Sequence, residues 1–151
     1  MIEREFKYEV STLTQNSNLA DELWQEIAFA YSMPTRFYHN LSHLDNLINE
    51  LNKVRSNISE WSLIVFAVAY HDIVYDTTRQ DNEEQSAIKA YNCLTKLDLS
   101  EAFKEKCRML ILATKGHSIS EESAANYLTD ADLSILGSAH TDYVKYSKQI
   151  R

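Results

Sequence analysis

Glycine and proline are scarce in this chain, which has two glycines and one proline among 151 residues. Tight turns depend heavily on these two residue types, so a fold of many short strands would lack material for its connections. Long helices joined by a few polar loops need fewer glycines and prolines. A chain of this length most often forms one domain and buries roughly 70% of its unfolded surface. We therefore expect one all-α domain over residues 1–151, a helical bundle.

Apolar residues that recur every three to four positions predict the individual helices. Residues 1–16 are weakly patterned and are predicted as a short lead-in. The expected helices cover about residues 19–31, 40–51, 60–75, 82–96, 101–114, 120–128, 130–136 and 141 to the end. Candidate N-terminal caps are Asn18, Ser59, Ser100 and Asp130, and Asp81 with Glu84 is typical of a capping box.

The most apolar run of the chain, from Trp61 to Tyr70, ends at the dipeptide His71-Asp72. A helix that is apolar on nearly all sides is expected at the centre of the bundle. A carboxylate at its end must be paired, hydrogen-bonded or bound to a metal, because an isolated buried charge is very costly. Imidazole is the commonest metal-ligand side chain. Taken alone, the dipeptide fits a helix-end histidine and a capping aspartate equally well.

Two further segments carry residues of the same kind. His39 and His43 are four residues apart, so they share a helix face if the helix begins by residue 39. On a shared face, both histidines could bind one metal, or one could bind the metal while the other faces a substrate. The alternative is that both are surface residues of an amphipathic helix. Asp132 is followed directly by apolar residues, which makes a simple capping role harder to accept for it than for Asp130.

Four of these residues form a plausible ligand set. His43, the pair His71-Asp72, and Asp132 come from three different predicted helices and offer only nitrogen and oxygen atoms. That mixture suits a divalent ion of manganese, iron, cobalt, magnesium or zinc. We therefore predict a metal site that supports hydrolytic chemistry.

The charge and the hydropathy of the chain limit the kinds of partner that we expect it to bind. The net charge is −7 and no Lys/Arg-rich block is present, which disfavours binding to a nucleic acid duplex. A small phosphorylated substrate stays compatible, because a metal supplies local positive charge. No apolar run reaches the roughly 20 residues that span a bilayer, and the N-terminus lacks a secretion signal, so we expect no membrane partner and a cytoplasmic location. Cys93 and Cys107 are expected to be buried free thiols.

Several motifs resemble known families. Tyr38-His-Asn-Leu-Ser-His43 resembles an element of the class I cyclic nucleotide phosphodiesterases, and Ala131-Asp-Leu-Ser134 resembles their last metal motif. Together with His71-Asp72, these segments match the order of motifs in the HD superfamily of metal-dependent phosphohydrolases. A bacterial group of predicted HD phosphohydrolases is similar over about residues 20–151. Further matches to that group are Arg36-Phe-Tyr-His-Asn40, Tyr70-His-Asp-Ile-Val-Tyr75, Asp81-Asn-Glu-Glu-Gln-Ser-Ala87 and Asp130-Ala-Asp-Leu-Ser-Ile-Leu-Gly137.

The resemblance implies an HD-domain helical bundle that hydrolyses a nucleotide or another small phosphate ester with a metal-activated water. It implies metal-ligand roles for His43, His71, Asp72 and Asp132, with Asp72 also part of the catalytic machinery and His39 as the proton donor. His117, Lys115 and Arg36 are candidates for contact with substrate phosphate. The competing interpretations are a solvated loop for Lys115 and His117 and surface salt bridges for Lys115 and Arg36.

Other functions fit the same residues. The acidic composition also suits a metal-binding nucleotide-sensing or regulatory module with little turnover. A di-iron oxygenase would need a second iron, with His117 as the spare histidine. A helical bundle without any site is the simplest alternative. The bacterial group usually continues past the segment that matches residues 143–151, so a truncated domain is a further expectation.

Overall fold

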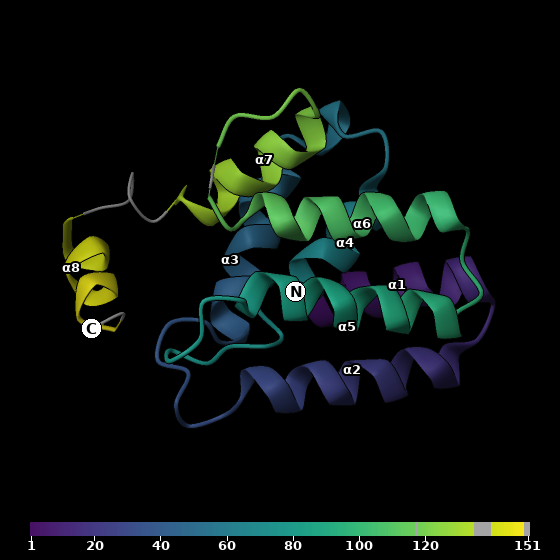
Figure 1. Ribbon diagram of the computed structural model, residues 1–151, viewed down its shortest axis with the longest axis horizontal. Helices are drawn as coiled ribbons and strands as arrows, with labels where there is room; N and C mark the ends of the chain where they lie inside the picture. The colour runs from purple at the N-terminus through teal and green to yellow at the C-terminus, as the bar shows by residue number, and fades with distance from the viewer. Residues whose placement is uncertain (117, 135–139, 150–151) are drawn as a thin grey trace.

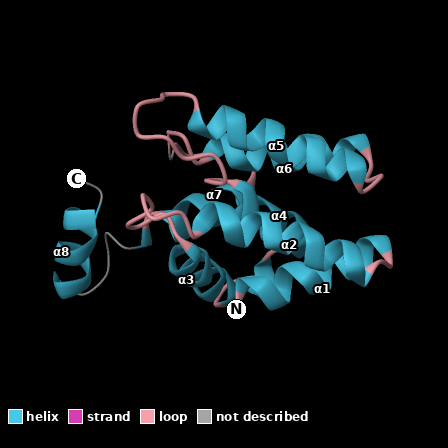
Figure 2. Cartoon of the chain, turned by 90° about the horizontal axis from the view of Figure 1, so that it is seen from below, coloured by secondary structure: helices cyan, strands magenta, loops and turns pink. Residues whose placement is uncertain are grey.

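The computed structural model describes residues 1–116, 118–134 and 140–149. These residues form helices joined by loops and contain no strand, which confirms the predicted all-α bundle (Figures 1 and 2). The elements are α1 (Ile2–Thr14), α2 (Ser17–Tyr31), α3 (Leu41–Asn52), a short 3-10 helix η1 (Arg55–Asn57), α4 (Trp61–Tyr70), α5 (Asn82–Lys96), α6 (Glu101–Ala113), α7 (Ser123–Asp132) and α8 (His140–Gln149).

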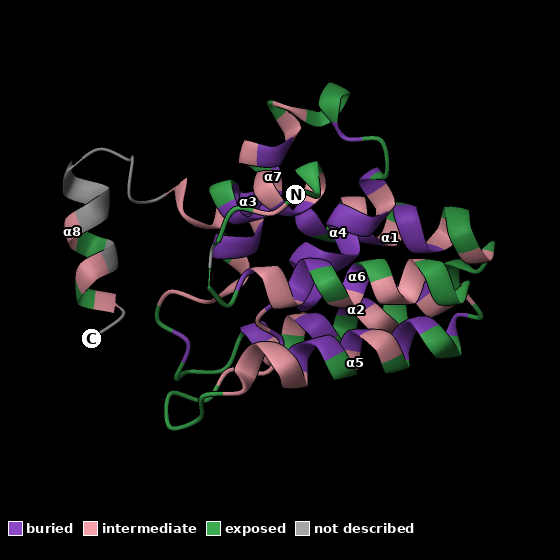
Figure 3. Cartoon of the chain, turned by 45° about the horizontal axis from the view of Figure 1, so that its top comes forward, coloured by how far each residue is buried: buried purple, intermediate pink, exposed green. Residues whose placement is uncertain are grey.

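Helix α4 is the centre of the bundle. All of its residues except Ser62 are buried (Figure 3). It contacts α1, α3, α5, α6 and α7, while α1 also pairs with α2 and α5 with α6. A helix with apolar side chains on every side can only be accommodated in this way, so the position predicted from the apolar run is confirmed.

The prediction for residues 1–16 was wrong, because most of this segment is helix α1. Ile2, Phe6 and Val10 recur every four residues and are buried on one face. Glu9 is also buried, and its Oε2 accepts a hydrogen bond of 2.5 Å from the Ser62 hydroxyl of α4. The charged residues between the apolar positions hid this pattern, although Glu3 and Arg4 lie on the exposed face of an ordinary amphipathic helix.

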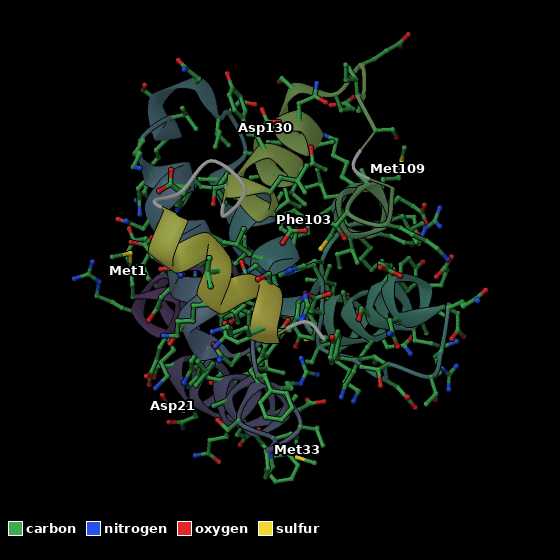
Figure 4. The ribbon with its side chains drawn as sticks, turned by 90° about the vertical axis from the view of Figure 1, so that its left-hand side faces the viewer. Met1, Asp21, Met33, Phe103, Met109 and Asp130 are labelled. Atoms are coloured by element: carbon green, nitrogen blue, oxygen red, sulfur yellow. The ribbon has the colours of Figure 1, made fainter. Side chains whose placement is uncertain are left out.

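Up to residue 134, helix α7 replaces the two short helices predicted over residues 120–128 and 130–136; the end of the second lies outside the described residues. Asp130 was expected to cap the second of them, but it lies inside α7 and is exposed (labelled in Figure 4). No glycine or proline interrupts this stretch. Leu128 and Ala131 continue the buried face at a spacing of three, so the helix runs through Asp130 without a break.

Other helix ends differ from the prediction by a few residues. Helix α4 ends at Tyr70, and no cap involves Ser59, because Glu60 precedes its first turn. Asn16, and not Asn18, caps α2 by accepting from the Leu19 amide at 3.1 Å. The predicted capping box is not formed: among the described residues, neither the Asp81 nor the Glu84 carboxylate accepts from a backbone amide at the start of α5. Asp81 instead pairs with Arg79 and accepts from the Gln85 side chain.

Ser100 does cap α6, since its Oγ accepts from the Phe103 amide at 3.2 Å. Replacing Ser100 with alanine leaves that amide without its partner, and we expect the free energy of unfolding to fall by about 1 kcal/mol. Urea unfolding monitored by circular dichroism measures the change. Ser56→Ala is the matched control, because Ser56 is exposed and caps no α-helix. Equal midpoints for the two variants would contradict the capping role.

Two remaining predictions concern the whole chain. Cys93 and Cys107 are buried and free, as expected. Among the described residues, no helix combines the length and the apolar character needed to cross a bilayer.

Candidate metal centre

The ends of three helices bring the predicted ligands together. His43 lies in the first turn of α3, His71 follows the last residue of α4, and Asp132 is the last residue of α7. Asn40 caps α3 by accepting from the His43 amide at 3.3 Å, which fixes the turn that carries this imidazole. One ligand atom from each of His43, His71 and Asp132 lies within 4.8 Å of the others.

The spacing of the ligand atoms suits a single ion. Asp132 Oδ1 lies 3.1 Å from His43 Nε2 and 3.7 Å from His71 Nε2. Asp72 Oδ2 approaches the same two nitrogens, at 4.0 Å from His43 and 3.0 Å from His71. Two ligands that are each about 2.1 Å from an ion lie about 3.0 Å apart at a right angle and about 3.4 Å apart in a tetrahedron. The two imidazoles and Asp132 are therefore spaced as the ligands of one ion would be, and Asp72 approaches both imidazoles from its own side.

Two nitrogens in this cluster have unmet bonding capacity. His43 Nε2 and His71 Nε2 are buried and, over the described part of the chain, have no hydrogen-bond partner, although a carboxylate oxygen lies 3.1 Å from the first and 3.0 Å from the second. His71 Nδ1 lies 2.8 Å from the Val68 carbonyl, which can only accept, so Nδ1 carries the proton. In the neutral ring Nε2 then presents its lone pair to the carboxylates. Leaving such atoms unpaired is costly, and a cation would satisfy both.

The charges of the cluster also call for a cation. Burial alone would raise the pKa of Asp72, but the neighbouring His71 and His39 rings outweigh it and bring that pKa to about 2. Burial likewise opposes a charged His71, yet Asp72 and Asp132 raise its pKa well above the ordinary value. Two carboxylates therefore attract positive charge to this spot. Since a metal requires the neutral imidazole, a proton and a metal ion compete for His71.

His39 lies at the rim of the cluster. It precedes the cap of α3, so it does not share a helix face with His43 as the spacing had suggested. Its Nε2 is nevertheless 3.8 Å from Asp72 Oδ2, and 24% of its side chain is exposed, against 2% for His43. Burial lowers the pKa of His39, and the Asp72 charge opposes this only in part. The ring lies 4.5 Å from that of Tyr75 and is open to a ligand that approaches from solvent.

Arg36 has a role that differs from both sequence-based interpretations. Its side chain is buried and forms no salt bridge with any residue that the structure describes, so it is not free at the surface to meet a phosphate. Nη1 donates to the carbonyls of Asp72 at 2.6 Å and His39 at 3.3 Å, and Nη2 donates to the Ile73 carbonyl at 2.7 Å. The side chain thus holds the backbone of the segments that carry the site.

Lys115 forms a surface salt bridge, which was one of its three interpretations. Its Nζ donates to Glu84 Oε1 and to the Gln80 carbonyl, which ties the end of α6 to the loop before α5. His117 lies outside the described residues. Of the three candidates for substrate contact, the structure therefore brings neither Arg36 nor Lys115 into an open position beside the ligands.

Tyr31 is a site residue that the sequence analysis missed. Its hydroxyl accepts a hydrogen bond of 3.1 Å from the Asp72 amide, and the residue is 1% exposed. In the sequence Tyr31 is the apolar end of a helix, and nothing in the pattern indicates that its hydroxyl reaches a residue 41 positions away.

No family model matches this chain. Nor does any curated protein or solved structure match it significantly. The interpretation of the cluster therefore depends on the residues themselves, on their spacing and burial, and on the motif order in the sequence.

Proposed function

We propose that this protein is an HD-type, metal-dependent phosphohydrolase whose substrate is a nucleotide or another small phosphate ester. One observation carries the proposal: two buried imidazole nitrogens without hydrogen-bond partners face two carboxylates that follow them in the HD motif order. The polar atoms of a buried side chain normally have at least one hydrogen-bond partner, from the protein or from ordered water. This pair is arranged as metal ligands are.

In this proposal His43, His71, Asp72 and Asp132 hold one divalent cation, of manganese, iron, cobalt, magnesium or zinc. The bound ion would polarise the phosphoryl oxygens and lower the pKa of a bound water from ~15.7 to ~7. The hydrogen bond from His71 Nδ1 to the Val68 carbonyl orients this ring toward the ion. The cation also offsets the net charge of −7, which would otherwise repel a phosphate.

His39 provides the proton for the departing alcohol. It is next to the ligand cluster but more exposed than the ligands, so it can reach a substrate that the metal does not cover. A positioned general acid contributes roughly 10²–10⁴-fold to the rate. In this proposal the four ligands hold the ion, and His39 transfers a proton from its Nε2.

The decisive experiment is an assay of metal-stripped protein on a panel of phosphomonoesters, phosphodiesters and nucleotides, with each ion added back separately. We expect metal-dependent release of product by the wild-type chain, and none by the double variant His71→Ala/Asp72→Ala. Asp130→Ala is the matched control, because Asp130 is an exposed carboxylate two residues from Asp132. It should keep full activity.

A wild-type chain that is no faster than the double variant on any substrate would contradict the proposed catalysis. Circular dichroism must show that the double variant is folded for this comparison to hold. Tight metal binding with saturable nucleotide binding, measured by calorimetry without product formation, would instead favour the sensing module.

A further inference from the structure

Arg36 carries a buried positive charge that is not used in an ion pair. Within residues 1–116, 118–134 and 140–149, no carboxylate oxygen lies within 4.0 Å of its guanidinium, as an ion pair would require. The side chain is 8% exposed and packs against the rings of Tyr31, at 4.7 Å, and Tyr75, at 5.5 Å. Its charge is directed instead at three backbone carbonyls, of which two belong to the turn that follows α4.

This turn needs donors, because a helix leaves its last carbonyls without partners inside the helix. The Val68 carbonyl is matched by the ring of His71, and those of Asp72 and Ile73 are matched by Arg36. Tyr31 completes the arrangement by accepting from the Asp72 amide. Asp72 is thereby held on both sides of its backbone, by Tyr31 at the N–H and by Arg36 at the carbonyl.

The choice of the carbonyl over the carboxylate has a chemical consequence. An arginine that paired with the Asp72 carboxylate would occupy both oxygens in a bidentate contact and compete with a metal for them. Because Arg36 holds the backbone, Oδ2 stays directed toward His71 Nε2 and His43 Nε2. The same guanidinium binds the His39 carbonyl, so it also joins the loop before α3 to the turn after α4.

We propose that Arg36 and Tyr31 are positioning residues for the metal centre, acting through the backbone of Asp72 and, for Arg36, of His39. They set where the Asp72 carboxylate and the His39 ring lie relative to the other ligands, without touching metal or substrate. The inference rests on the metal site proposed above. It assigns the affinity and the coordination geometry of that site in part to two residues outside the ligand set.

The test replaces Arg36 with lysine, which keeps the charge but has no planar fork to bridge three carbonyls. Cobalt(II) is titrated into metal-stripped protein, and both the dissociation constant and the visible absorption spectrum are recorded. We expect affinity to fall about 10- to 100-fold, as is typical when a group that orients a ligand is removed. The spectrum should change, because the ligand field reports the placement of Asp72. Tyr31→Phe removes only the hydroxyl and should shift both quantities in the same direction.

Two controls separate positioning from general loss of stability. Leu94→Ala removes a fully buried side chain from α5 and destabilises the bundle, but it should leave the cobalt spectrum unchanged. Arg108→Lys alters a surface arginine that pairs with Glu105 and should change neither quantity.

The proposal is overturned if both Arg36→Lys and Tyr31→Phe bind cobalt with wild-type affinity and spectrum, or if Leu94→Ala changes the spectrum as much as they do. If Arg36→Lys does not fold, Tyr31→Phe decides the matter. A wild-type chain that binds no cobalt would instead remove the proposed function itself, so the two failures are distinguishable.

Discussion

Replacing His43 with alanine is expected to abolish metal binding, whereas replacing His39 with alanine should leave the metal in place and slow turnover roughly 10²–10⁴-fold. The two histidines are four residues apart, yet they occupy different positions. His43 is almost fully buried, and its Nε2 lies 3.1 Å from Asp132 Oδ1. His39 is partly exposed, and its closest recorded carboxylate contact is 3.8 Å, to Asp72.

The pair of variants provides its own control. Alanine at position 43 leaves two carboxylates with one imidazole, whereas alanine at position 39 removes no atom from the proposed ligand set. Elemental analysis of each purified variant gives metal per chain, and the phosphoester panel gives turnover. Retention of full metal content by His43→Ala would contradict its role as a ligand. Loss of metal from His39→Ala would move His39 into the ligand set.

Phe66→Ala is expected to lower the free energy of unfolding by about 3–5 kcal/mol. Phe66 lies on α4 and is fully buried. Its ring makes edge contacts with Phe6 of α1, at 5.3 Å, and Phe103 of α6, at 5.9 Å. Truncation therefore opens a cavity between three helices. It also removes two contacts between aromatic rings, which stabilise the fold beyond the burial of their apolar surface.

Urea unfolding of the metal-stripped protein measures this loss without a contribution from bound ion. Phe29→Ala is the matched control, because Phe29 is 74% exposed on α2 and its removal should change the free energy of unfolding by less than about 0.5 kcal/mol. A cost at Phe66 as small as that at Phe29 would mean that α4 is not packed between α1 and α6 as described.

The sequence predicted the fold best where one physical signal dominated. The run from Trp61 to Tyr70 has too much apolar surface for any position but the centre, and α4 lies there. Helix α1 was missed although Ile2, Phe6 and Val10 repeat correctly, because a buried Glu9 looks like a solvent-facing residue until its partner Ser62 is known. Long-range partners of this kind leave no trace in local periodicity.

In the site, too, some features were predictable from the local sequence and others depended on long-range contacts. Residue type, together with the resemblance to the HD motif order, was enough to predict that His43, His71 and Asp132 lie together. The role of Arg36 could not be predicted in the same way. An arginine side chain reaches far enough to face water, phosphate or backbone, and only the turn after α4 decides among them.

The enclosure of α4 determines which parts of this protein are free to change over evolution. A helix without a free face cannot vary at one position without affecting a neighbouring helix, so we expect substitutions on α4 to disturb the core and the base of the site together. In the loop from Ser32 to Asn40, the exposed side chains of Met33 and Phe37 have no such restriction, unlike the buried Arg36. This loop, with Met33 labelled in Figure 4, lines an open pocket together with the first turn of α3. Substitutions at Met33 and Phe37 are therefore expected to be tolerated more readily than substitutions on α4.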